Sequence, residues 1–244
     1  MIRLVDLQKS FGEIDAVNQI SLQINKGEIF GFIGNNGAGK TTTIKMMIGL
    51  LKPDNGQIII DGIDVEQNPL KVKKRAGYAP EEPVLYEYLS GYEFLDFIAD
   101  VKGLNSKERK DQIEELLEFF ALTEKQNQMI KTYSHGMRKK VALAAAFIAR
   151  PKILLLDEPI TGLDPECSYR TKQRLTHLSK EGVTIFFSSH ILEAVEKICH
   201  RIGIIHEGRL ILSCTMEELR LQFHNASSLE EIFVQLTEKS KGKY

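Results

Sequence analysis

The stretch Gly34-Asn35-Asn36-Gly37-Ala38-Gly39-Lys40-Thr41 decides the fold, because it fits the pattern G-x-x-x-x-G-K-[ST] of a phosphate-binding loop. Residues 28–33 before it are predicted as a short buried strand, and residues 42–48 after it as a helix. Glycines let backbone N–H groups approach a phosphate, and the helix N-terminus adds partial positive charge. The sequence therefore predicts an anion site between a strand and a helix.

Three side chains at the end of this loop have the chemistry to hold a nucleotide. Lys40 can reach the β- and γ-phosphates, the Thr41 hydroxyl can ligate Mg²⁺, and Thr42 adds a second hydroxyl. A glycine-rich turn that binds nothing is the alternative, and the complete motif in its strand–helix frame argues against it. The predicted phosphate-binding residues are Gly34, Asn35, Asn36, Gly37, Ala38, Gly39, Lys40, Thr41 and Thr42.

Composition excludes several other classes of protein. The chain has 244 residues, of which 43% are hydrophobic and 27% charged, as is usual for a soluble globular protein. The formal net charge of -1 gives no electrostatic reason to expect nucleic acid or an anionic membrane surface as a partner. Cys167, Cys199 and Cys214 are scattered and are expected to be free thiols. The longest apolar runs are too short to span a bilayer, so work at a membrane would require a membrane partner.

Alternating strand and helix patterns predict an α/β fold, a phosphate-loop (RecA-like) core with a mostly parallel sheet. Residues 2–7 and 17–24 are predicted as antiparallel strands, separated by a turn at residues 10–12. Helical patterns fill residues 85–150, where Ser90 and Glu93 are spaced as a capping box and a last helix runs from Ser134 to about Arg150. We expect one domain over residues 1–244, in which residues 1–84 and 151–215 form the nucleotide-binding core, residues 85–150 a helical subdomain and residues 216–244 a helical tail.

An acid pair follows the most apolar strand of the chain. Residues 153–156 are all apolar, as expected for a strand buried on both faces, and Asp157 and Glu158 follow it. Beside a phosphate loop, Asp157 is placed to ligate Mg²⁺ and Glu158 to polarise the attacking water. An acid pair that only ends a strand is the alternative. His190 follows another buried strand and is expected at the same sheet edge, where it would contact the γ-phosphate; a helix cap is its alternative.

The order of the motifs carries a family resemblance. After the phosphate loop come Ser134-His135-Gly136 at a helix start, Leu-Asp-Glu-Pro at residues 156–159, Thr-Gly-Leu-Asp at residues 161–164, and Ser189-His190. This order resembles the nucleotide-binding subunit of an ATP-binding cassette (ABC) transporter, over nearly the whole chain from Met1 to about Met216. The resemblance implies an ATPase that uses ATP and Mg²⁺.

The resemblance also implies a dimer in which two cassettes close head to tail around two ATP molecules. Ser134 and Gly136 of one subunit would contact the γ-phosphate held by Lys40, Glu158 and His190 of the other. The signature segment that carries them consists of Ser134, His135, Gly136 and Met137. Asp164 would cross the dimer interface. Phe11 would stack on adenine, unless it is a turn aromatic packed on the core, and Val17 joins the expected ATP-binding residues.

Two positions depart from the family pattern. The signature is usually Leu-Ser-Gly-Gly-Gln, and here it is Tyr133-Ser134-His135-Gly136-Met137. Glu81 stands where the family usually has glutamine, and its carboxylate can meet Mg²⁺ or ATP but carries a negative charge. Both departures resemble the cassettes of ABC-2 type exporters, which handle drugs, peptides, lipids or polysaccharides.

The partner expected from the resemblance is an integral membrane permease, which would hold the cassette at the cytoplasmic face of the membrane. A second ATPase subunit, identical or paralogous, completes the assembly. Candidates for the permease surface, each of which could instead belong to the helical core, are Tyr86, Tyr88, Leu89 and Tyr92. The main alternative is a soluble cassette ATPase of an iron–sulfur assembly scaffold. A nucleic-acid or ribosome-acting cassette is disfavoured by the single set of motifs and the absence of a basic surplus.

Overall fold

The structure, a computed structural model, describes residues 1–224, 226 and 228–241. The strands in chain order are β1 (Ile2–Phe11), β2 (Ile14–Ile24), β3 (Ile29–Ile33), β4 (Asn55–Ile60), β5 (Ile63–Asp64), β6 (Ala76–Ala79), β7 (Ile153–Asp157), β8 (Thr184–Ser189), β9 (Arg201–His206) and β10 (Arg209–Thr215). The helices are α1 (Lys40–Met47), α2 (Pro69–Arg75), α3 (Gly91–Val101), α4 (Ser106–Phe119), α5 (His135–Phe147), α6 (Pro165–Lys180), α7 (Leu192–Ile198), α8 (Met216–Gln222) and α9 (Leu229–Lys241), with short 3₁₀ helices at Thr123–Lys125 and Ile130–Thr132.

Within residues 1–224 the strands form two sheets, and the larger one positions the site. Its order is β10-β9-β3-β8-β7-β6, with parallel pairs from β9 to β6 and an antiparallel hairpin of β9 with β10. Ile33 lies opposite Ser189, and Asp157 lies opposite Ser188, so the carboxyl ends of β3, β8 and β7 are neighbours. Ligands of open α/β sheets bind outside such strand ends.

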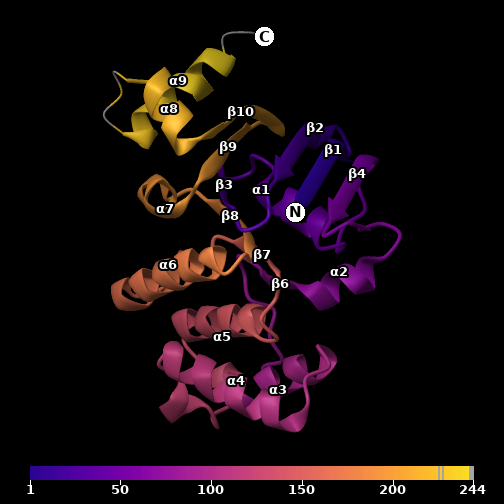
Figure 1. The fold of residues 1–244 in the computed structure, drawn as a ribbon, viewed down its shortest axis with the longest axis vertical. Coiled ribbons are helices and arrows are strands. Elements are labelled where there is room, and N and C mark those ends of the chain that lie inside the picture. The colour runs from indigo at the N-terminus through magenta and orange to yellow at the C-terminus, as the bar shows by residue number, and fades with distance from the viewer. Residues whose placement is uncertain (225, 227, 242–244) are drawn as a thin grey trace.

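Each parallel strand contributes to two hydrophobic cores, because alternate side chains of a strand point to opposite faces of its sheet. On β3, Ile29 and Ile33 belong to one core, whereas Phe30 and Phe32 belong to the other. The first core includes residues of α5, α6 and α7, and the second includes α1 and the smaller sheet, on the other side of the large sheet in Figure 1. Burial on both faces therefore explains the continuous apolar pattern of these strands.

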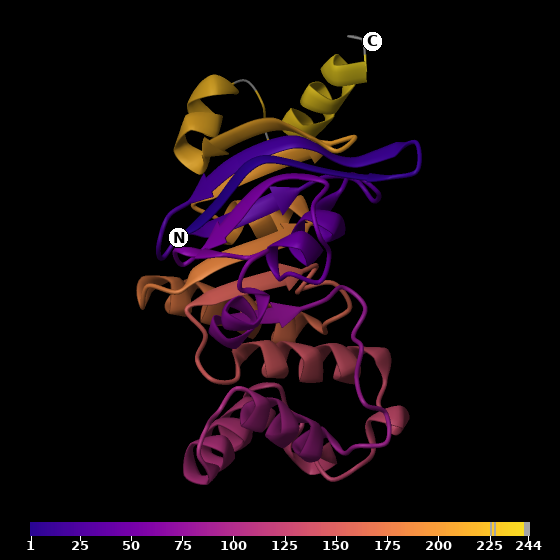
Figure 2. The same ribbon diagram turned by 90° about the vertical axis from the view of Figure 1, so that its right-hand side faces the viewer.

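The smaller sheet and helices α3, α4 and α5 lie beside the large sheet (Figure 1). The smaller sheet has the order β2-β1-β4-β5 with antiparallel pairs. Helices α3, α4 and α5 lie together at the end of the molecule opposite α8 and α9 (Figures 1 and 2). The capping box of Ser90 and Glu93 that the sequence predicts is present at the start of α3. Helix α5 packs against β6 so closely that a Cβ atom on Gly77 would lie 1.9 Å from the Ala146 carbonyl oxygen.

The predicted fold class is confirmed, and the differences concern element boundaries. Strand β1 runs through Phe11 and β2 begins at Ile14, so the connecting turn is tighter than expected. Helix α5 ends at Phe147 rather than near Arg150, because Ala149 and Arg150 have φ angles of 64° and 44°, which a helix cannot contain. The predicted tail includes α8 and α9, and its residues 225, 227 and 242–244 lie outside the described residues.

The contact between α5 and β6 generates a prediction on stability. We expect Gly77→Ala to lower the free energy of unfolding by about 3 kcal/mol, because the new Cβ must displace the backbone of α5. Gly62→Ala is the control, since Gly62 has open space around it and a φ of 75°, so its cost is about 1 kcal/mol from backbone strain. Urea unfolding of both variants measures the difference, and equal costs would contradict the close approach.

Candidate nucleotide-binding site

The phosphate loop joins β3 to α1 in a conformation that requires glycine. Gly39 is the N-cap of α1 with a φ of 108°, and a Cβ atom there would lie 2.2 Å from the Ala16 carbonyl oxygen. A Cβ atom on Gly34 would lie 2.5 Å from the Ile205 carbonyl oxygen. No side chain caps the first turn of α1, so its N–H groups are available to an anion. The local geometry therefore follows from the spacing of the motif.

A cavity opens directly at this loop. Its volume is about 340 Å³, and the residues that line it are Ala16, Asn36, Gly37, Gly39, Lys40, Thr41, Thr42 and Glu81. Glu81 reaches the cavity because it follows β6, whose carboxyl end lies at the same sheet edge as that of β7. The structure thus places the loop, the two threonine hydroxyls and Glu81 around one space.

Lys40 is a buried ammonium group held by the loop itself. Its Nζ donates to the carbonyl oxygens of Gly34 and Asn35, at 2.8 and 3.1 Å, and lies 3.7 Å from Oε1 of Glu158. A buried charge is costly unless it is paired, and here carbonyl dipoles and one carboxylate supply the compensation. The ammonium group is therefore positioned in the cradle in which a phosphate would lie.

Glu158 stands at the centre of the polar contacts. Its side chain is 2% exposed, and Oε1 lies 2.9 Å from Nδ1 of His190, a side chain that is 46% exposed. Its other oxygen accepts a hydrogen bond from the Thr161 hydroxyl at 3.2 Å. The φ of Glu158 is 49°, which is unfavourable for a residue with a side chain. Stored strain and a buried carboxylate beside a phosphate cradle are typical of a catalytic position.

Asp157 is fully buried and is only half satisfied by its surroundings. Its Oδ1 accepts a hydrogen bond from the Ser188 hydroxyl, whereas Oδ2 has no hydrogen-bond partner among the described residues. An unpartnered buried carboxylate oxygen fits the needs of Mg²⁺ or of a water bound to it. Among the described residues there is no group of three or more His, Cys, Asp or Glu side chains that could hold a metal ion by itself. A magnesium ion here would therefore depend largely on phosphate and water oxygens, as is usual for this ion.

The signature residues lie away from the phosphate loop of their own chain. Ser134 caps α5 by accepting a hydrogen bond from the Met137 N–H at 3.2 Å. His135 and Gly136 lie against Gly162: the imidazole lies 3.5 Å from a Cβ position built there, and a Cβ on Gly136 would be 3.3 Å from the Gly162 carbonyl oxygen. None of these residues lines the phosphate-loop cavity. The two groups of predicted residues are therefore not brought together within one chain.

Asp164 occupies the N-cap of α6 and contacts α5. It accepts a hydrogen bond from the Cys167 N–H at 2.8 Å and lies 2.6 Å from the Lys140 ammonium. The Lys140 ammonium and this helix-cap hydrogen bond lower the pKa of the Asp164 carboxyl. Half of its side chain stays exposed, at 49%. A further contact across an interface is thus compatible with its place in the chain.

Phe11 and Val17 differ in their access to a ligand. Phe11 ends β1, and is 51% exposed with the Lys9 ammonium 5.7 Å from its ring centroid. Val17 is 1% exposed and belongs to a core, so Ala16 rather than the Val17 side chain lines the cavity. The burial of Val17 leaves its backbone, rather than its side chain, for a contact with a ligand.

Sequence reasoning missed the side chains that hold the acid pair in place. The Ser188 hydroxyl donates to Asp157 and accepts from the Glu158 N–H at 3.0 Å, and Thr161 donates to Glu158. The position of Ser188, directly before Ser189-His190, was the available signal in the sequence. The side to which the Ser188 side chain points, however, depends on the register of β8 with β7. Strand pairing is thus needed before these roles can be assigned.

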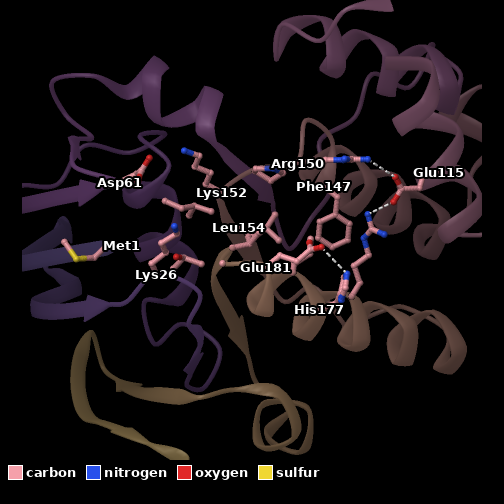
Figure 3. A pocket seen from close by; sticks show the side chains of 17 residues that line it. Met1, Lys26, Asp61, Glu115, Phe147, Arg150, Lys152, Leu154, His177 and Glu181 are labelled. Atoms are coloured by element: carbon pink, nitrogen blue, oxygen red, sulfur yellow. Dashed lines mark hydrogen bonds and ion pairs between the residues drawn. The ribbon is translucent and has the colours of Figure 1, made fainter. Parts of the chain in front are cut away.

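A larger cavity, of about 570 Å³, lies elsewhere. It is lined by residues at the amino ends of β7 and β8, and Glu115 within it contacts Arg150 and Arg174 while His177 contacts Glu181 (Figure 3). Residues at the ends of α5 and α6, where helix carbonyls carry partial negative charge, also line it. The smaller cavity at Lys40 is the one that combines a glycine loop, a lysine and a helix N-terminus without a side-chain cap, which are the groups that bind phosphate.

The fold and this geometry define a phosphate-loop ATPase, and comparison with known proteins specifies its family. A sequence profile of the family described as "ABC transporter" matches residues 17–161. The chain is 37% identical over 219 residues to the linearmycin resistance ATP-binding protein LnrL of Bacillus subtilis (strain 168), covering 90% of this chain and 70% of that protein. The chain belongs to the ABC transporter family.

Solved structures agree with this assignment. A structure described as the ATP binding subunit of an ABC transporter matches with a TM-score of 0.91 and 34% identity, covering 97% of this chain and 99% of that one. A dimeric post-hydrolysis structure of the ATP-binding cassette MJ0796, bound to ADP and Pi, matches with a TM-score of 0.82 and 25% identity over 88% of this chain and 99% of that one. The chain is thus an ATP-binding cassette with ATPase chemistry. None of the described helices is long and apolar enough to cross a membrane.

The position of Lys40 generates a binding prediction. We expect Lys40→Ala to raise the Kd for ATP roughly 100-fold, because the phosphates lose a buried cationic partner worth about 3 kcal/mol. Lys52→Ala is the matched control, since that lysine is 74% exposed and pairs with Glu66 at the surface. Isothermal titration calorimetry of both folded variants measures the change. An unchanged affinity in Lys40→Ala would exclude Lys40 from the phosphate site.

Proposed function

We propose that this chain is the ATP-hydrolysing subunit of an exporter whose membrane-spanning permease is a separate protein. The observation that carries the proposal is the buried Glu158 carboxylate, which lies beside Lys40 and His190 at the edge of the phosphate cradle. The similarity to a protein named for linearmycin resistance supports export of a drug-like or peptide-like compound. The similar proteins described above are a drug-resistance protein and a subunit of an ABC transporter, and they favour this interpretation over an iron–sulfur assembly scaffold.

The residues present can carry the hydrolysis of ATP. The loop N–H groups and Lys40 hold the β- and γ-phosphates, and Lys40 then exchanges its carbonyl partners for phosphate oxygens. Thr41, Asp157 and Glu81 would hold Mg²⁺, which supplies polarisation of the phosphate oxygens. Glu158 accepts the proton of the attacking water, a form of help worth ~10²–10⁴-fold in rate. His190 fixes the Glu158 carboxylate and contacts the γ-phosphate.

We infer that each active site is completed by a second cassette, identical or paralogous. The Ser134–Met137 segment lies outside the cavity at Lys40 in its own chain, although it begins α5, and the partial positive charge of a helix N-terminus suits an anion. The dimeric MJ0796 structure supports an arrangement in which two cassettes meet. Asp164, which is half exposed beside Gly162, would then lie at the interface between the two subunits.

The permease would dock on the helical part, residues 85–150, which we propose as a subdomain inserted between the two parts of the nucleotide-binding core. Exposed large apolar side chains gather at the start of this part and just before it, in the segment that follows Glu81: Val84 at 89%, Tyr86 at 59% and Tyr88 at 78%. Tyr86 also packs edge-on against Phe94 and Phe97. Leu89 and Tyr92 pack against the core instead, so they are weaker candidates for the docking surface. Docking would place the chain at the cytoplasmic face of the membrane.

The role of Glu158 leads to a prediction on turnover. We expect Glu158→Gln to keep ATP affinity but to slow hydrolysis by 10²-fold or more, because the amide cannot accept the proton of water. Since opening of the closed dimer requires hydrolysis, the variant should accumulate as an ATP-bound dimer. Steady-state hydrolysis and light scattering after size-exclusion chromatography measure the two effects. Wild-type turnover in this variant would show that Glu158 is not the base.

The proposed docking surface generates a prediction on partners. We expect the tagged chain, purified from detergent-solubilised host membranes, to bring with it a multi-spanning protein that mass spectrometry identifies. Val84→Asp should reduce this capture at least 10-fold, because it places a charge in an apolar contact. Ile14→Asp is the matched control on the antiparallel sheet, where Ile14 is 71% exposed. A soluble partner without any membrane protein would favour the assembly-scaffold alternative.

A further inference from the structure

Lys139 is a buried cation to which the chemistry above assigns no role. It lies on α5, little more than one turn after Ser134, and is 2% exposed. Its Nζ donates to the Glu81 carbonyl oxygen at 2.7 Å and lies 3.4 Å from the carbonyl oxygens of Pro80 and Asp157. The ammonium group therefore joins the signature helix to two other segments, the loop after β6 and the carboxyl end of β7.

These two segments carry two acidic side chains that the proposed function assigns to the nucleotide site. Glu81 lines the phosphate-loop cavity, and Asp157 is the buried carboxylate with an unpartnered oxygen. Lys139 binds the backbone oxygens of both residues, so it does not occupy their carboxylate oxygens. A displacement of the Glu81 loop on nucleotide binding would consequently pull on α5 through this ammonium group.

Burial of the Lys139 ammonium costs solvation free energy, but the carboxylates around it favour its charged form. Burial lowers the pKa of Lys139, whereas the carboxylates of Asp157, Glu81, Glu158 and Glu82 act in the opposite direction. A buried cation contributes little to stability compared with an apolar side chain of similar size. The presence of a lysine at this buried position is thus better explained by the contacts of its ammonium group than by a contribution to the stability of α5.

We propose that Lys139 is a positioning residue that couples the Glu81 loop of one nucleotide site to the signature segment that the same subunit presents to the other site. The coupling acts along α5, which begins with Ser134 to Met137 and is fixed against β6 by the close approach at Gly77. The neighbouring Lys140 contacts Asp164 on a different face of the helix, so the two lysines have separate partners. The inference rests on the proposed dimeric ATPase and adds the path by which its two sites communicate.

The test compares three variants of the full chain. Lys139→Met keeps the length of the side chain and removes its donors, and Lys139→Gln keeps an N–H donor for a carbonyl oxygen. Lys102→Met is the matched control, because the Lys102 ammonium also donates to backbone carbonyls, one of them Ala76 at 2.7 Å, and burial lowers its pKa to about 8. Lys102 lies at the end of α3, and its partners do not line the nucleotide cavity.

We measure ATP affinity by calorimetry, and kcat and the Hill coefficient for ATP by steady-state hydrolysis. In Lys139→Met we expect ATP affinity within 3-fold of wild type, a kcat at least 10-fold lower and a Hill coefficient close to 1. Lys139→Gln should recover part of both kinetic losses, and Lys102→Met should match wild type.

Two results would overturn the inference: wild-type kcat and Hill coefficient in Lys139→Met, or equal losses in Lys102→Met, which would indicate general loosening of the helical part. Failure of the proposed function has a different signature. In that case the unmodified chain itself would hydrolyse ATP with a Hill coefficient of 1 and would not dimerise with ATP.

Discussion

The arrangement of the site depends on one constraint, which is that two carboxylates are buried side by side at the carboxyl end of β7. Asp157 and Glu158 are 0% and 2% exposed, and their charges require cations and donors close by. The Lys40 ammonium and the His190 imidazole lie beside the Glu158 carboxylate, and the Ser188 hydroxyl donates to the Asp157 carboxylate. The Lys139 ammonium, on α5, contacts the backbone carbonyl oxygen of Asp157. Buried acids held in this way are typical of functional sites, which is why the proposed function rests on them.

Much of the fold could be predicted from the sequence because its signals are local. The glycine spacing of the phosphate loop, the capping box at Ser90 and Glu93 and the apolar run before Asp157 each act over a few residues. The prediction that the phosphate loop, the acid pair and His190 lie close together rests on one further rule, which is that the carboxyl ends of parallel strands lie at the same edge of a sheet. The order β3-β8-β7 satisfies that rule.

The parts that sequence reasoning missed depend on contacts between distant segments. Ser188 acts on Asp157 through strand register, and Lys139 reaches Glu81 across a helix–loop contact, with no local pattern that marks either. Ala16 rather than Val17 lines the cavity, because the side chains of β2 alternate between a core and the ligand side. Each of these contacts depends on the strand register to within one residue or on the reach of a long side chain, and the hydrophobic periodicity of the sequence determines neither.

The central claim is that one chain holds the nucleotide and the acids while a second chain completes the site. The most direct measurement is the specific ATPase activity of the purified chain over a wide range of protein concentration, with mass determined by light scattering at each point. We predict that specific activity rises with concentration and levels off as the ATP-bound dimer becomes the main species. A constant, non-zero specific activity throughout the range in which the chain is monomeric would contradict the account.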